Sequence, residues 1–367
     1  MLKLLSLNMI RILLLILLTF TYSKYSFSKK LSEDDLLKMS PNQLIISAKN
    51  GDPLAQLWLG DALYNGSIPN WKSFNVCEWY YKSAQQNNAD AAIKLYNYLK
   101  YITTTCPKLI NLEKPNLDRS YWLLKAARLN NSEAQLYLYY ESKNETTKLR
   151  WLKKSVKNNH SPAIEVLASL HLSGSLVEKN VKTAIELLNK ASKLDPKDEY
   201  PDIQLARIYS NKMFLQQMSI YKGRLKLGEI KKMDDTTAKL LKTFNYSNYF
   251  DIEKAISSSK TCIEKKLSYT CYSYLVQFYS KKMYGNIDFD EAMFWLDEAE
   301  EVLKNSDHHS SILTTKGLAY LNWDNLKVNK VKARKYFLKA IELIKKSKSL
   351  SMNDRIKTIE DWLQYTY

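Results

Sequence analysis

Residues that interrupt helices, and residues that carry most enzyme chemistry, are both scarce in this chain. Only 8 Gly, 8 Pro, 4 His and 4 Cys occur among its 367 residues. Few helix breakers and few alternating strand patterns predict an all-α fold. No glycine-rich phosphate loop, nucleophile elbow or zinc-protease motif occurs. The sequence therefore predicts a protein that is not an enzyme and uses no cofactor.

The histidines and cysteines also lack the spacing of a metal site. The sequence contains no Cys-x-x-Cys pair, and no histidine lies close to a cysteine along the chain. His308 and His309 are adjacent, and on a helix this places their imidazoles about 100° apart, a poor arrangement for holding one ion. We therefore predict no bound metal.

Residues 1–28 are predicted to be a signal peptide. They combine a basic start, an apolar run over residues 12–20 and a small-x-small cleavage site that ends at Ser28. The run is shorter than the roughly 20 residues that span a bilayer, which leaves an uncleaved anchor as the alternative. No later segment is long and apolar enough to span a membrane. We expect a periplasmic or secreted mature chain, without a transmembrane span.

One helix-to-helix joint recurs at least four times along the chain. Each copy closes one helix with two small or apolar residues, places Gly or Asn three residues later, and opens the next helix with Ala after four more. Gly and Asn tolerate the left-handed conformation that ends many helices. The four copies are Gly51 with Ala55, Asn87 with Ala91, Asn130 with Ala134, and Asn159 with Ala163.

The joints predict a helical hairpin that repeats. In the fourth copy, Ser161 is predicted to be the N-cap, with Pro162 in the first turn of the helix. Hairpins of this length stack, so we expect a superhelical solenoid of antiparallel helix pairs.

A second landmark lies in the second helix of each hairpin. A large residue is followed four positions later by a small one, as in Trp79 with Ser83 and Trp122 with Ala126. Residues four apart share one helix face, so the small residue allows close helix approach beside the large one.

The first helix of each hairpin also has a recurring pattern. The segments from Ala55 to Gly66 and from Ala163 to Gly174 share the same length, and the second helix from Trp79 to Ala84 follows the first of them. These segments resemble the SEL-one-like repeat family, a relative of the tetratricopeptide repeats. The resemblance implies a helical solenoid that binds partners.

The resemblance also divides the chain. Residues 29–195 are predicted to be the SEL-one-like array, residues 196–347 degenerate SEL-one-like or tetratricopeptide-like hairpins, and residues 348–367 a capping helix. The alternative is two lobes joined near residues 211–250.

The four cysteines suggest disulfides. Cys77 and Cys106 lie at similar distances on either side of Ala91, and Cys262 and Cys271 flank a predicted joint. Exported chains retain disulfides, and four cysteines allow three pairings. We favour Cys77–Cys106 with Cys262–Cys271, and four buried thiols are the alternative. The resemblance supports the second pair, because small secreted members of the family link successive helices in this way.

The candidate partner-binding residues are the positions of the first helices that vary between copies. The other positions are used for packing, so the variable ones should face the inner groove. Large aromatic side chains there are typical of binding hot spots, although packing against neighbouring helices is the alternative. The predicted binding residues are Trp58, Asp61, Tyr137, Tyr140, Val166 and Ser169.

The chain has a formal net charge of +17. Such a charge would suit an acidic polysaccharide, a cell-wall polymer or a membrane surface. Most lysines, however, are spaced as on solvated helix faces, and no nucleic-acid motif occurs, so we predict no nucleic-acid partner.

The leading hypothesis is therefore an exported, non-catalytic scaffold that binds a protein or peptide in its inner groove. The alternatives are a scaffold for exopolysaccharide assembly or export, which the resemblance also allows, and a cell-wall or β-lactam-binding enzyme.

Overall fold

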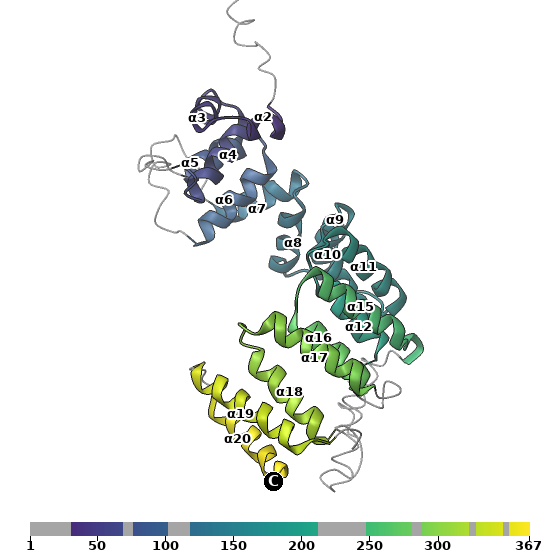
Figure 1. Cartoon of the computed structure of the whole chain (residues 1–367). Helices are drawn as coiled ribbons and strands as arrows, with labels where there is room; N and C mark the ends of the chain where they lie inside the picture. Colours follow the sequence, from purple (N-terminus) through teal and green to yellow (C-terminus); the bar gives the residue numbers. More distant parts are fainter. Residues whose placement is uncertain are drawn as a thin grey trace, which may run out of the picture. The chain divides into compact units, whose positions relative to one another are not determined.

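The computed structural model describes residues 31–68, 76–101, 118–211, 247–280, 288–322, 328–347 and 352–367. The predicted signal peptide, residues 1–28, lies outside them, as does Cys106. Within these ranges the regular structure is helical and no strand occurs, so the predicted all-α fold is confirmed (Figure 1). No helix in the described ranges is long and apolar enough to cross a membrane.

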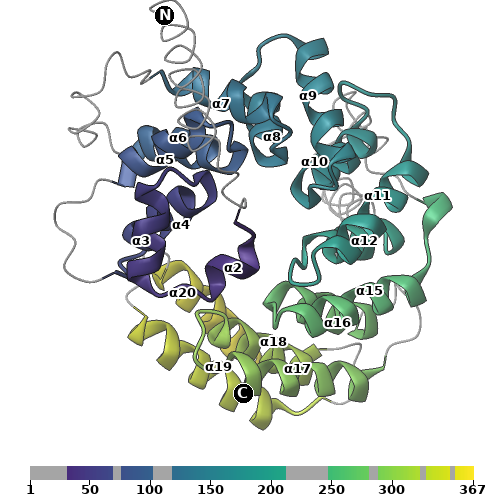
Figure 2. The ribbon, with the colours of Figure 1, turned by 90° about the horizontal axis from the view of Figure 1, so that it is seen from above.

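The chain forms two compact units, Met1–Asn158 and Asn159–Tyr367. In each unit, helices that follow one another along the chain pack side by side as a solenoid of hairpins (Figure 2). The predicted divisions at residues 195 and 347 stay predictions.

The first unit begins with two short helices and continues with three hairpins: α4 with α5, α6 with α7, and α8 with α9. Its helices are α2 (Glu33–Leu37), α3 (Pro41–Lys49), α4 (Pro53–Tyr64), α5 (Val76–Gln85), α6 (Ala89–Tyr101), α7 (Arg119–Arg128), α8 (Ser132–Glu141) and α9 (Glu145–Lys157).

The described residues of the second unit form four hairpins, α10 with α11, α12 with α15, α16 with α17, and α18 with α19, and α20 packs on α19. Its α-helices are α10 (Ser161–Ser173), α11 (Val181–Leu194), α12 (Tyr200–Tyr209), α15 (Ile252–Lys265), α16 (Tyr269–Ser280), α17 (Phe289–Leu303), α18 (His309–Asn322), α19 (Lys330–Lys346) and α20 (Met352–Leu363). The described part of this unit also has two short 3-10 helices, η2 (Ser247–Tyr249) and η4 (Gln364–Thr366).

The recurring joint has the predicted left-handed residue in all four copies. The backbone φ angles are 98° at Gly51, 62° at Asn87, 68° at Asn130 and 57° at Asn159. These positive values are favourable for Gly and tolerated by Asn, which explains why only these two residue types occupy the position.

The start of the next helix differs from the prediction. In the first three copies the helix begins two residues before the alanine, and the side chains of Asp52, Asn88 and Asn131 accept the amide hydrogen of that alanine. In the fourth copy Ser161 was wrongly predicted as the N-cap, which is His160. The Ser161 hydroxyl is buried, with two acceptors within reach: Glu165 of its own helix at 3.2 Å and the carbonyl of Ala191 at 3.3 Å.

Neutral hydrogen bonds join successive hairpins of the first unit. Buried Gln135 donates to the carbonyl of Ala127 at 3.0 Å and accepts from the Asn158 amide at 3.0 Å. The same arrangement occurs in the α4–α5 hairpin. There Gln56 donates to the carbonyl of Ala48 and accepts from the Gln86 amide. Each buried glutamine satisfies a carbonyl at the end of the preceding helix.

Both units contain a close approach between a glycine and an aromatic ring twenty residues later. A Cβ on Gly60 would overlap the ring of Tyr80, and a Cβ on Gly317 would overlap the ring of Phe337. The missing side chain therefore allows the two helices of α4–α5, and of α18–α19, to pack at this point.

Charged groups are buried in the second unit. Lys316, only 2% exposed, pairs with Asp297 and Glu300, and Lys339 also reaches Glu300 at 3.0 Å. A second pair joins Lys265 to Asp202 at 2.7 Å, and the side chains are only 10% and 5% exposed. Buried charges require such partners, because an unpaired charge in the interior is strongly unfavourable.

The predicted disulfide between Cys262 and Cys271 is confirmed. The bond closes the joint between α15 and α16, with a Cα–Cα distance of 6.1 Å. Cys77 is also disulfide-bonded. Its predicted partner, Cys106, lies outside the described residues.

Candidate partner-binding surface of the first unit

The first helices of the three hairpins place equivalent side chains in a common register. Counting three and six residues from Ala55 in α4 gives Trp58 and Asp61. The same count from Ala134 in α8 gives Tyr137 and Tyr140. Residues three apart lie on nearly the same helix face, so each helix presents this pair in one direction.

These helices, together with α5, surround a hollow of about 410 Å³. Its lining is rich in tyrosine and in hydrogen-bonding side chains. The lining residues are Asp61, Tyr64, Asn65, Tyr80, Lys94, Asn97, Tyr98 and Tyr137.

Asp61 is the charged centre of the hollow. Its Oδ1 atom accepts from the Tyr80 hydroxyl at 2.7 Å and from the Lys94 ammonium at 2.8 Å. Burial, followed by the hydrogen bond to Asp61, raises the pKa of Tyr80, so the phenol keeps its proton and donates. Among the described residues both bonds end on Oδ1, which leaves Oδ2 for a ligand.

Tyrosine rings form the apolar part of the lining. The Tyr98 ring makes edge contacts with Tyr64 and Tyr80, with centroid distances of 6.5 and 6.4 Å. Tyr64 is 64% exposed although it belongs to this ring cluster. Exposed rings beside amide and carboxylate groups are the composition of a binding hot spot, because one side chain offers both apolar area and a hydrogen bond.

A second polar contact fixes the neighbouring part of the surface. The Tyr96 hydroxyl donates to Glu141 at 2.5 Å, and Arg119 lies 3.5 Å from the same carboxylate. Burial and the hydrogen bond to Glu141 raise the pKa of Tyr96, so this phenol also stays protonated. The Tyr137 ring packs 5.7 Å from the Tyr96 ring, between this contact and the hollow.

The structure brings some of the predicted residues together. Asp61 and Tyr137 line the hollow, and Tyr140 is 57% exposed on α8. Trp58 instead packs against both hydrophobic clusters of the first unit and is only partly exposed. Val166 and Ser169 lie on α10 of the second unit, where each is partly buried.

Sequence reasoning missed Lys94 and Asn97, which stand three and six residues after Ala91 in α6. They occupy in α6 the same positions, relative to the alanine, that Trp58 and Asp61 occupy in α4, so aligning the α6 copy with the others would have identified them. Tyr80 and Tyr98 could not be found in this way, since they lie outside the two counted positions and reach the hollow through the packing of α5 and α6.

Five segments of the chain, residues 53–70, 77–96, 121–131, 161–196 and 317–343, match the model of the Sel1 repeat. In these five segments the chain is similar to the Sel1 repeat. This confirms the resemblance to the SEL-one-like family, and three of the matched segments lie in the first unit. A comparison with curated proteins gives no match.

Solved structures of similar fold include other Sel1 repeat proteins. One is a Sel1 repeat protein from Oxalobacter formigenes, 19% identical, with a TM-score of 0.48 over 73% of this chain and 92% of that one. Another is c5321, a protective antigen of uropathogenic Escherichia coli, 15% identical, with a TM-score of 0.42 over 89% and 68%. A third is the human IFIT1 dimer with m7Gppp-AAAA, 16% identical, with a TM-score of 0.37 over 83% and 61%. None of these likenesses carries an argument about function.

Proposed function

We propose that this protein is an exported, non-catalytic scaffold that binds a protein partner through the hollow of its first unit. Sel1-type solenoids typically bind proteins, because stacked hairpins present a row of first-helix side chains to one partner. The observation that carries the proposal is the hollow itself. There the exposed ring of Tyr64 lies beside Asn65, Asn97 and the Asp61–Lys94 pair.

The chemistry of the hollow suits an extended peptide segment. Asparagine side chains can both donate to and accept from a peptide backbone, and tyrosine rings cover apolar side chains. The Asp61–Lys94 pair is partly exposed, with side-chain exposures of 31% and 41%, so it can exchange partners with a polar ligand.

Export is supported by the predicted signal peptide and by the disulfide that closes the α15–α16 joint. Disulfides persist in the periplasm and outside the cell, whereas reducing compartments keep most thiols free. The polysaccharide and enzyme alternatives stay predictions without a supporting contact.

The test is a peptide-library selection on the full chain, followed by fluorescence anisotropy with the selected peptides. The double variant Tyr64→Ala/Asn97→Ala should weaken binding at least tenfold, since it removes about 1.4 kcal/mol or more of contact free energy. Both side chains are at least partly exposed, so the free energy of unfolding should change by less than about 0.5 kcal/mol.

Tyr121→Ala is the matched control, because Tyr121 is an exposed tyrosine of the first unit, 44% accessible, on the second helix α7. It should bind the selected peptides as the wild type does. Equal binding by the double variant would overturn the proposed site.

Export is tested separately by fusing residues 1–28 to a reporter that is active only outside the cytoplasm, and an inactive fusion would contradict it.

A further inference from the structure

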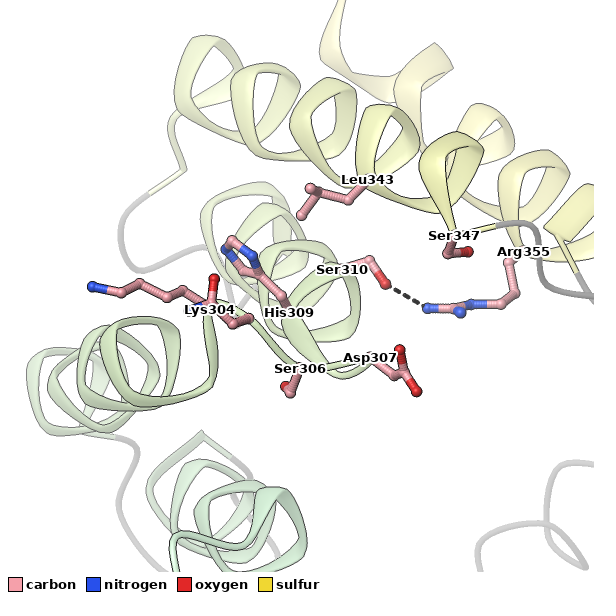
Figure 3. Close-up of a pocket in the computed structure, with 9 residues that line it drawn as sticks. Lys304, Ser306, Asp307, His309, Ser310, Leu343, Ser347 and Arg355 are labelled. Atoms are coloured by element: carbon pink, nitrogen blue, oxygen red, sulfur yellow. Dashed lines mark hydrogen bonds between the residues drawn. The ribbon is translucent and has the colours of Figure 1, made fainter.

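The second unit contains a polar pocket at the end of its helical stack. Its volume is about 370 Å³, and it is formed where α17, α18, α19 and α20 meet (Figure 3). Three serines, one imidazole and one guanidinium are among its lining side chains. These residues are Ser306, His309, Ser310, Ser347 and Arg355.

Arg355 enters the pocket from α20 and points toward Ser310 (Figure 3). Its Nη2 atom donates to the hydroxyls of Ser310 at 2.7 Å and Ser311 at 3.3 Å. Both partners are neutral, and among the described residues no carboxylate lies within ion-pair distance of this guanidinium. A guanidinium has five N–H donors, so several remain for a ligand.

Ser310 supplies a second donor at the same place. Ser310 is only 6% exposed, and its hydroxyl oxygen accepts a hydrogen bond from Arg355. In the described part of the chain its hydroxyl hydrogen has no acceptor. A buried hydroxyl hydrogen without an acceptor is unfavourable, and a ligand oxygen in the pocket would accept it.

His309 forms the opposite wall beside Leu343 (Figure 3). Its Nε2 atom is buried without a hydrogen bond and lies 3.7 Å from the Glu300 carboxylate. Glu300 is already neutralised by Lys316 and Lys339. The negative charge behind this wall is therefore compensated within the protein and does not oppose an anion in the pocket.

Two other charged residues line the pocket with different consequences. Lys304 extends away from it in Figure 3, and its ammonium bonds to Glu301 at 2.6 Å. Asp307 is an exposed carboxylate at the rim, where it would repel an anion. The pocket thus has one cation directed inward and one carboxylate that should weaken anion binding.

We propose that this pocket binds a phosphate group, held by the Arg355 guanidinium and the Ser310 hydroxyl. Arginine presents its donors in a planar fork that matches the oxygens of phosphate, and its bonds to an anion are stronger than bonds between neutral groups. The phosphate belongs either to the free ion or to a phosphorylated side chain of a partner. The site shares no residue with the hollow of the first unit, so either proposal can fail without the other.

The test is isothermal titration calorimetry of the full chain with inorganic phosphate and, in a second arm, with a phosphoserine peptide. Arg355→Gln should weaken phosphate binding roughly tenfold to a hundredfold, the range for a lost hydrogen bond to a charged group. Ser310→Ala should weaken binding by a smaller factor. Asp307→Asn should strengthen it, because the repelling carboxylate is removed.

Lys304→Gln is the matched control and should leave phosphate affinity unchanged, since this ammonium points away from the pocket. Circular dichroism checks that each variant is folded, and Asp307→Asn gives a gain that no folding defect can mimic. Tighter binding of the phosphopeptide than of inorganic phosphate would identify a modified partner as the source. Equal binding would identify the free ion. No binding by the wild type, or wild-type affinity in Arg355→Gln, would overturn the proposal.

Discussion

The two units satisfy their buried polar groups by different chemistry. In the first unit, neutral side chains such as Gln56 and Gln135 bond to the carbonyls that end the preceding helices. In the second unit, charged pairs such as Lys316 with Glu300 and Lys265 with Asp202 lie between helices, and each pair contains one fully buried partner. The same hairpin repeat therefore accepts either solution, provided that each buried group has a partner.

The difference extends to equivalent positions of the repeat. Tyr80 packs on Gly60 and its hydroxyl bonds to Asp61, at the edge of the candidate binding surface. Phe337 packs on Gly317, and the residue in the position of Asp61 is Leu318, which joins the same apolar cluster. A polar pair is kept where the surface is proposed to bind a partner, and an apolar pair closes the corresponding place in the second unit.

The largest effect should come from breaking the ion-pair network of the second unit. Lys316→Met leaves Asp297 and Glu300 without their buried cation and should cost about 3 kcal/mol, the low end for one lost partner of a buried pair, because Lys339 still reaches Glu300. Hydrogen exchange should show the loss of protection in α17, α18 and α19. Unchanged protection of these helices would mean that the network does not stabilise the second unit.

Reducing the Cys262–Cys271 disulfide should have the next largest effect. A loop of about ten residues gives roughly 2–3 kcal/mol in the chain-entropy description. The double variant Cys262→Ala/Cys271→Ala should lower the denaturant concentration at which α15 and α16 unfold. In this variant, reductant should no longer change that midpoint. Equal midpoints for the oxidised wild type and the variant would show that the bond adds no stability.

A smaller effect is expected from removing one of the buried glutamines that form neutral hydrogen bonds in the first unit. Gln135→Ala removes one hydrogen bond to Ala127 and one from Asn158, and should cost about 1–3 kcal/mol, the range for a buried group left without a partner. The cost should not depend on salt concentration, since no charge is involved. Gln364→Ala, at an exposed position, is the control and should change stability by less than about 0.5 kcal/mol.

The stability of the second unit should also depend on pH. Burial, and then the nearby Asp198 carboxylate, raises the pKa of Glu165 to about 7. Because the folded state favours the protonated form, the unfolding free energy should fall as pH rises from about 4.5 to 7. Glu165→Gln should flatten this part of the profile in denaturant titrations, and a profile unchanged by the substitution would contradict the assignment.

Glu300 should act in the opposite direction at lower pH. Burial alone would raise its pKa, but the hydrogen bonds and charges of Lys316 and Lys339 outweigh burial and lower the pKa to about 2. Its contribution to stability is therefore complete above the unfolded pKa and is lost as pH falls from about 4.5 toward 2.

Local rules made the helical joints predictable. A left-handed backbone admits few residue types, so Gly51, Asn87, Asn130 and Asn159 were identifiable from the sequence alone. Ser161 was assigned wrongly because a serine before a proline has the local signature of an N-cap, whereas its hydroxyl bonds to Ala191 on the neighbouring helix. The prediction failed because the hydroxyl points toward Glu165 and Ala191 and leaves the helix start to His160.

The candidate surface was predictable only in part for the same reason. Comparison of the repeat copies selects positions on one face of the first helix, and two of them, Asp61 and Tyr137, line the hollow. The sequence pattern could not show that Trp58 packs against two hydrophobic clusters, because the burial of a side chain depends on which helices pack on either side.

By itself, the sequence determined the repeated hairpin and its left-handed joints, because both follow from local backbone conformation. It favoured the Cys262–Cys271 bond without excluding the other pairings. Only the tertiary structure decided the hollow around Asp61, the buried network around Lys316 and the pocket around Arg355. Each of these joins side chains from three or more helices, and their meeting depends on packing that no local pattern specifies.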